Sequence, residues 1–187
     1  ISTEDGAIHF NSTIVSAGHY GLRLNAGLAN VTLEDSLGFD GHLDVNDRTT
    51  NGLGAITFDS PVIFGRTSAC TSCGLIIATD NQPITLNYSL NDAVNGRHDL
   101  IISAGTSQVN LFGSIGATNA FASLEVWGTA NLSSSITTTG NQNYHNSVAL
   151  KENVAMTSTT GDIVFWANVY GDGASVIPRD LIQFLGN

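Results

Sequence analysis

A 21-residue motif occurs twice in this 187-residue chain, at a constant offset of 78 residues. The first copy runs from Gly18 to Gly38 and the second from Gly96 to Gly116, and eight of the 21 positions are identical. A second motif, in which Gly-x-Ile-x-Phe is followed four residues later by Ile or Val, begins at Gly6, Gly54 and Gly161. Motifs that recur inside one short chain indicate repeated structural units, each burying its apolar edge against the next.

Apolar and polar residues alternate in short runs along the whole chain. Examples are Ile8-His9-Phe10, Val31-Thr32-Leu33, Ile56-Thr57-Phe58, Ile84-Thr85-Leu86 and Leu124-Glu125-Val126. This period of two is typical of a strand with one buried face, and Gly, Asn or Asp separates the runs as turn residues do. Ser, Thr and Asn supply 55 residues and Gly another 20, a composition that disfavours helices. The sequence therefore predicts an all-β chain of many short strands.

The repeats favour a parallel β-solenoid over other all-β folds. Stacked coils of roughly 20–25 residues would give about eight coils, with apolar residues lined up in columns inside. Tandem antiparallel β-sandwiches are the alternative, because two such domains would also show alternation and a long-range repeat. We expect residues 1–174 to form the repeat region and residues 175–187, which are more apolar, to form a C-terminal cap or an exchanged strand.

The chain has few charged residues, and most of them are acidic. Charged residues make up 12% of the chain, and 16 acidic against six basic residues give a net charge of −10. Nucleic acids and anionic membrane surfaces require a basic face, so we expect neither as a partner. No run of ~18 apolar residues is present, so we expect no membrane insertion by a helix.

The stretch from 138 to 165 carries motifs that are found in known proteins. The pattern T-T-G-x-Q-x-Y-x-x-x-V-x-L matches Thr138-Thr139-Gly140, Gln142, Tyr144, Val148 and Leu150, and T-S-T-x-G-x-I-x-F matches Thr157-Ser158-Thr159, Gly161, Ile163 and Phe165. The chain resembles, over most of residues 6–170, the repeats of large bacterial surface proteins of the filamentous-haemagglutinin-like and autotransporter adhesin type. The resemblance implies a secreted, right-handed parallel β-helix, and it carries over no active residue.

Two functions follow as hypotheses. The resemblance implies a non-catalytic structural or adhesive module, extracellular on a bacterial cell surface, that attaches to a host or matrix ligand such as a glycan. The alternative is a subunit of an extracellular filament, self-associating end to end, because open sheet edges accept further strands and the tail from 175 could complete a neighbour's sheet. A carbohydrate-active β-helical enzyme is a third class, but no catalytic motif supports it and we expect no cofactor.

Cys70 and Cys73 are the only cysteines. A redox Cys-x-x-Cys usually begins a helix, whereas the residues that follow Cys73 read as a strand. A zinc site would need two more ligands at suitable spacing. In an extracellular chain, as the resemblance implies, we expect a small disulfide loop between Cys70 and Cys73, with free thiols as the alternative.

Few other residues suggest a binding site. Asp40, Asp44 and Asp47 offer closely spaced oxygen ligands of the kind that suits calcium, although Asp44 lies in an alternating run where it would simply point outward. Trp127 and Trp166 are candidates for stacking on sugar rings, but the alternation around each favours a partly buried or edge-packing role. The five histidines are scattered. The sequence thus assigns no catalytic, cofactor-binding or metal-binding residue.

Overall fold

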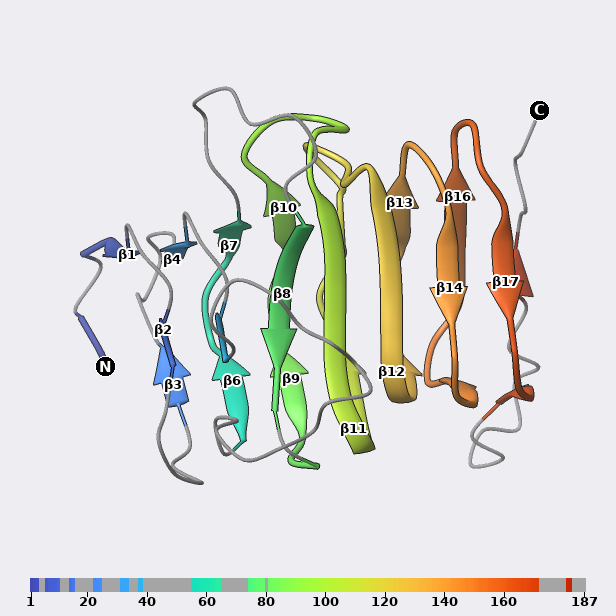
Figure 1. Ribbon diagram of the computed structural model, residues 1–187, viewed down its shortest axis with the longest axis horizontal. Helices are drawn as coiled ribbons and strands as arrows, with labels where there is room; N and C mark the ends of the chain where they lie inside the picture. The colour runs from blue at the N-terminus through green and yellow to red at the C-terminus, as the bar shows by residue number, and fades with distance from the viewer. Residues whose placement is uncertain are drawn as a thin grey trace.

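The alternating runs form short β-strands (Figure 1). The computed structural model describes residues 1–3, 6–10, 14–15, 22–24, 31–33, 37–38, 55–64, 74–79, 81–171 and 181–182. Within these residues every regular element is a strand and none is a helix. The prediction of an all-β chain is confirmed, as the scarcity of helix-forming residues led us to expect.

The strands form three ladders that run along the molecule. The first ladder contains β1 (Ile8–Phe10), β4 (Val31–Leu33), β7 (Val62–Phe64), β10 (Leu90–Asp92), a bridge at Ile115, β13 (Ile136–Thr138), β16 (Val154–Ser158) and β19 (Leu181–Ile182). The second contains β2 (Ile14–Val15), β5 (Leu37–Gly38), β8 (Gly74–Ala78), the first halves of β11 (Asp99–Leu111) and β12 (Ser123–Leu132), β14 (Gln142–Tyr144) and β17 (Ile163–Phe165). The third contains β3 (Leu22–Leu24), β6 (Ile56–Phe58), β9 (Ile84–Leu86), the second halves of β11 and β12, β15 (Val148–Leu150) and β18 (Val169–Gly171).

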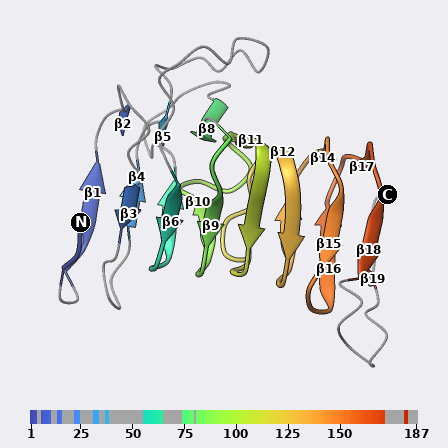
Figure 2. The same ribbon diagram turned by 90° about the horizontal axis from the view of Figure 1, so that it is seen from below.

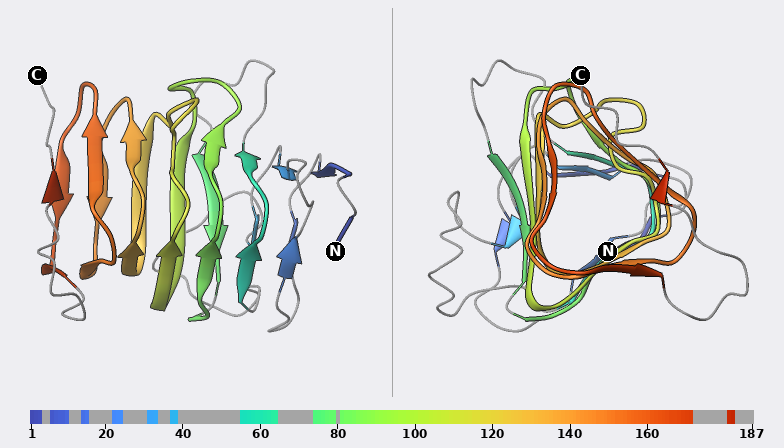
Figure 3. Two further views of the ribbon diagram at one scale, coloured as in Figure 1. Left: turned by 180° about the vertical axis from the view of Figure 1, so that it is seen from behind. Right: turned by 90° about the vertical axis from the view of Figure 1, so that its right-hand side faces the viewer.

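The chain visits the three ladders in turn and then returns to the first, one strand further along. After β1, β2 and β3, strand β4 pairs with β1, β5 with β2 and β6 with β3 (Figures 1 and 2). Seen along the long axis, the strands enclose a three-sided interior (Figure 3). All strand pairs in the described residues are parallel, which argues against the antiparallel sandwiches that we considered as the alternative.

Inward-facing side chains stack in columns from one strand to the next. In the third ladder one buried column consists of Ile56, Ile84, Val109, Ala130 and Val148, and the other of Phe58, Leu86, Leu111, Leu132 and Leu150. Burial of this apolar area, at about 25 cal/mol per Å², is the main stabilising contribution of the interior. The alternation in the sequence is thus the alternation between interior and solvent.

Asparagine and glycine hold the corners between the ladders. Asn81 has a φ of 56° and Gly105, in the next strand layer, has a φ of 59°. The Oδ1 atom of Asn81 accepts a hydrogen bond from the backbone N–H of Thr106 (2.8 Å), and a Cβ at Gly105 would lie only 2.3 Å from that oxygen. Further asparagine side chains accept backbone N–H groups from a neighbouring layer, namely Asn91, Asn95, Asn141 and Asn146. These cross-layer bonds give a structural role to the many asparagines of the sequence.

The 78-residue repeat does not superpose equivalent faces of the molecule. Leu22 lies in the third ladder and Leu100 in the second, while Val31 lies in the first ladder and Val109 in the third. The matching strands of the two copies therefore lie in different ladders. The expected boundary between residues 174 and 175 lies outside the described residues, although β19, from the predicted cap, pairs with β16.

Candidate functional site

A row of rings lies on the outer side of the second ladder. Strands β12, β14 and β17 are neighbours there. Trp127 lies on β12, and His145 and Trp166 directly follow β14 and β17. The rings of Trp127 and His145 stack with centroids 3.5 Å apart and planes 9° apart. The ring of Trp166 is parallel to that of His145 within 2°, with centroids 6.3 Å apart. We call these three residues the aromatic row.

A carboxylate lies beside the aromatic row. The Oε2 atom of Glu125 accepts a hydrogen bond from the Nε1–H of Trp127 at 3.4 Å and lies 3.8 Å from Nε2 of His145. Burial lowers the pKa of His145, and the nearby carboxylate of Glu125 opposes that shift. The net shift is downward, so the imidazole is neutral at pH 7 and does not offset the charge of that carboxylate.

The two tryptophans differ in exposure. Trp127 is partly buried beneath the imidazole of His145, as the alternation predicted. Trp166 is 69% exposed, so the prediction of a packed role is wrong for this residue. The physical reason is the wider separation of its ring from that of His145, which leaves most of the indole uncovered. An exposed indole can stack on the C–H face of a sugar or on a cation.

A buried Asp–His pair lies at the corner that follows β10. The Oδ1 atom of Asp92 is 2.6 Å from Nδ1 of His98, and the two side chains are at most 1% exposed. The carboxylate also accepts the backbone N–H groups of Val94, Arg97 and His98 at 3.0–3.2 Å. The Nε2 atom of His98 is buried and makes no hydrogen bond. Since solvent does not reach either side chain, the pair shapes this corner and offers no accessible general base.

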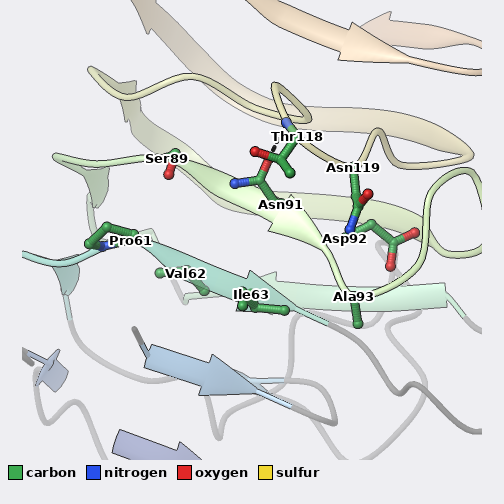
Figure 4. A pocket seen from close by; sticks show the side chains of 9 residues that line it. All are labelled: Pro61, Val62, Ile63, Ser89, Asn91, Asp92, Ala93, Thr118 and Asn119. Atoms are coloured by element: carbon green, nitrogen blue, oxygen red, sulfur yellow. Dashed lines mark hydrogen bonds between the residues drawn. The ribbon is translucent and has the colours of Figure 1, made fainter. Parts of the chain in front are cut away.

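A cavity of about 320 Å³ lies on the outer side of the first ladder (Figure 4). Its floor is formed by Pro61 and Ile63, and its rim by Asn91 and by the segment that carries Thr118 and Asn119. The rim is fixed by a hydrogen bond of 2.9 Å from the backbone N–H of Thr118 to Oδ1 of Asn91. The volume of the cavity lies at the lower end of the range for small-molecule sites. Its accessible polar groups are amides and hydroxyls.

Several residues that the sequence singled out lie outside the described residues. These are Cys70, Cys73, Asp40, Asp44 and Asp47, so the disulfide and the calcium site stay predictions. In the part of the chain that the structure describes, no three His, Cys, Asp or Glu side chains are placed to hold a metal ion. A search of the same residues finds no helix with the length and apolarity needed to cross a membrane.

The sequence did not reveal the groups that surround the two tryptophans. The rings of Trp127 and His145 meet because Val126 pairs with Tyr144, and the separation of 18 residues is shorter than the roughly 20–25 we expected for a coil. Asp92 and His98 are six residues apart in sequence, a spacing with no known signature. The first contact depends on the pairing of β12 with β14 and the second on the local path of the chain after β10.

Comparison with known proteins does not extend this description. No protein-family model, no curated protein and no solved structure matches the chain.

Proposed function

We propose that this protein is a non-catalytic structural and adhesive module of a secreted bacterial cell-surface protein, built as a right-handed parallel β-helix. One observation carries the proposal: three parallel ladders surround an interior of stacked side chains through all the described strand layers. Such an arrangement adds stability layer by layer and produces an elongated scaffold whose surface can vary freely.

The outer surface supports this assignment. Its strand positions carry neutral hydrogen-bonding side chains that link neighbouring layers, as where the Nδ2–H of Asn131 donates to Oδ1 of Asn110 at 2.7 Å and that of Asn110 to Oγ1 of Thr85 at 3.1 Å. Lys151 is the chain's single lysine. A surface that is braced by neutral side chains and poor in lysine suits a protease-exposed location outside the cell, in agreement with the resemblance to bacterial adhesins.

The β-helix can be tested by a crosslink between neighbouring layers. Thr57 and Thr85 are paired outward residues of β6 and β9, and paired strands lie about 4.8 Å apart, within the Cα range of a disulfide. In a Cys70→Ser, Cys73→Ser background, Thr57→Cys with Thr85→Cys should form an intramolecular disulfide on mild oxidation, detected by mass spectrometry. The matched control, Thr57→Cys with Thr137→Cys, places the second thiol in another ladder and should not. Equal yields in both variants would contradict the proposed fold.

The adhesive function can be tested with beads that carry the intact chain. Under flow, we expect such beads to be retained on epithelial monolayers or on polysaccharide films several-fold better than beads that carry an inert acidic protein of similar size. Equal retention would refute adhesion. Release of reducing sugar from the films would instead identify the protein as a carbohydrate-active enzyme.

End-to-end assembly into a filament is the second candidate. In the described residues, each of β1, β2 and β3 pairs with a strand on one of its two edges. The same holds for β17 and β18 at the other end of the ladders. Size-exclusion chromatography over a wide concentration range tests this candidate, and a monomer at every concentration would refute it.

A further inference from the structure

The aromatic row ends in the most exposed of the large apolar side chains in the described residues. Trp166 is 69% exposed, compared with 52% for Tyr88 and 47% for Tyr170. An exposed tryptophan lacks the stabilisation that burial of a large apolar side chain provides, and tryptophan is enriched where proteins bind partners. Its position in a row of parallel rings, beside a carboxylate, distinguishes it from an isolated surface residue.

We propose that the aromatic row and Glu125 form a binding platform for a neutral oligosaccharide. The inference rests on the adhesive function proposed above, and it names the ligand class. The C–H face of one sugar unit stacks on the indole of Trp166, and hydroxyls of the oligosaccharide donate hydrogen bonds to the carboxylate of Glu125.

The contacts of the row place the carboxylate and the exposed indole on either side of one imidazole. The Oε2 atom of Glu125 is 3.8 Å from Nε2 of His145, and the ring centroid of His145 is 6.3 Å from that of Trp166. A ligand that stacks on Trp166 therefore has a hydrogen-bond acceptor close by, on the other side of His145.

The row is also rigid before the ligand binds. The ring of Trp127 is stacked on that of His145, and its Nε1–H is already bonded to Glu125. Asn143 pairs with Glu125 in the ladder, is partly exposed, and offers an amide between the two ends of the platform. Because Glu125, Trp127 and Asn143 lie on strands, little conformational entropy of these three side chains is lost on binding.

Electrostatics favour a neutral sugar over an acidic one. The chain has a net charge of −10, and the neutral imidazole of His145 does not offset the charge of Glu125. Uronic and sialic acids would therefore be repelled.

The first experiment measures binding of short neutral oligosaccharides to the intact chain by calorimetry and by intrinsic fluorescence. Both tryptophans of the chain lie in the row, so fluorescence reports on the proposed site directly. Trp166→Ala should weaken binding by at least about tenfold, the usual threshold effect of a central contact residue. Trp166→Tyr should retain most of the affinity, because it keeps an aromatic face.

Tyr170→Ala is the matched control. Tyr170 is also an exposed aromatic residue, but it lies on the third ladder, on the other side of the corner, and its removal should leave binding unchanged. Unchanged thermal melting of both variants shows that the comparison concerns binding and not folding. Glu125→Gln should weaken binding by only a few-fold, because the amide oxygen can still accept a hydrogen bond.

Four outcomes would overturn the inference. These are wild-type affinity in Trp166→Ala, tighter binding of acidic than of neutral oligosaccharides, binding of a cationic peptide in place of any sugar, and loss of sugar binding only in Asn91→Leu, which would place the ligand in the cavity on the first ladder. Beads that carry Trp166→Ala separate this inference from the proposed function. If they are retained as well as beads with the unmodified chain, adhesion stands and the platform is refuted.

Discussion

The strand layers around β6 to β9 and those around β12 to β17 share a backbone arrangement but place their side chains differently. In the earlier layers the phenylalanines Phe58 and Phe64 are fully buried, and Thr57 and Thr85 face outward. In the later layers Trp127, His145 and Trp166 face outward. We call the first group of layers the apolar-core layers. We call the second group the polar-core layers, because Gln142 is buried in their interior.

The interior of the polar-core layers contains a hydrogen-bonded network. Gln142 is fully buried in a column that otherwise consists of Leu75, Leu100, Leu124 and the partly buried Ile163. Its Nε2 donates to Oγ1 of Thr138 at 3.2 Å and to the backbone carbonyl of Thr157 at 2.8 Å, and its Oε1 accepts from the hydroxyl of Tyr144 at 3.2 Å. The comparison teaches that parallel strand layers accept either apolar packing or a hydrogen-bonded polar network inside, as where both the Nε2 and the Oε1 of Gln142 have partners.

The largest effect is expected from a cavity in the apolar-core layers. Phe58→Ala removes a fully buried ring that stacks on Leu86, and it should lower the free energy of unfolding by about 4 kcal/mol. Thr57→Ala, on the outward face of the same strand, should change it by less than about 0.5 kcal/mol. Urea denaturation measures both. Similar midpoints for the two variants would show that Phe58 does not lie in a packed interior.

A smaller effect is expected from breaking the network of the polar-core layers. Gln142→Leu inserts the residue type that fills the same column elsewhere, yet it leaves the Tyr144 hydroxyl without its partner, so we expect a loss of about 2 kcal/mol. Adding Tyr144→Phe removes that orphaned hydroxyl. The double variant should therefore be less destabilised than the sum of the single variants, by about 1 kcal/mol. Strict additivity in a double-mutant cycle would show that the two side chains are not coupled.

Alternation made the strands predictable because it follows directly from the geometry of a strand with one buried face. Ile8–Phe10, Ile56–Phe58, Ile84–Leu86 and Ile163–Phe165 were each expected from the sequence and are strands. The run Leu43–Val45 lies outside the described residues. Strand positions thus needed no knowledge of the tertiary structure.

The pairing of those strands could not be predicted, because corners of different length separate them. Val62 pairs with Leu90, whereas Ala130 pairs with Val148, so the number of residues between paired positions changes along the chain. A repeated motif identifies a pair of successive strands, but not the ladder in which each strand lies. This explains why equivalent residues of the two copies of the 78-residue repeat lie in different ladders. The aromatic row depends on pairing across three strands, and for that reason sequence reasoning found the tryptophans without their neighbours.

Removal of a single hydroxyl from the network has a smaller effect again. Tyr144→Phe should cost about 1 kcal/mol at neutral pH, the usual value for one buried hydrogen bond. Burial also raises the pKa of Tyr144 far above its ordinary value near 10. The unfolded chain therefore loses this proton above about pH 10 while the folded chain keeps it, and stability should fall as the pH rises beyond that value.

The alkaline limb of the stability curve tests this assignment. Tyr144→Phe should flatten the decline above about pH 10, whereas Tyr170→Phe, on an exposed tyrosine, should leave it as it is. If both variants decline as steeply as the unmodified chain, the phenol of Tyr144 is not buried, and the contrast between the two groups of layers loses its main support.

The smallest effect concerns the outer face of the polar-core layers. Burial lowers the pKa of His145, so the folded chain binds a proton less readily than the unfolded chain, whose histidine titrates near 6.5. Stability should therefore decrease as the pH falls below about 6.5, by well under 1 kcal/mol because the ring is partly exposed to screening solvent. His145→Gln should remove this slope between pH 7 and pH 5. Burial lowers the pKa of His145 and Glu125 raises it. A slope of the opposite sign would therefore mean that the effect of Glu125 is the larger one, and that the folded chain binds this proton more readily than the unfolded chain.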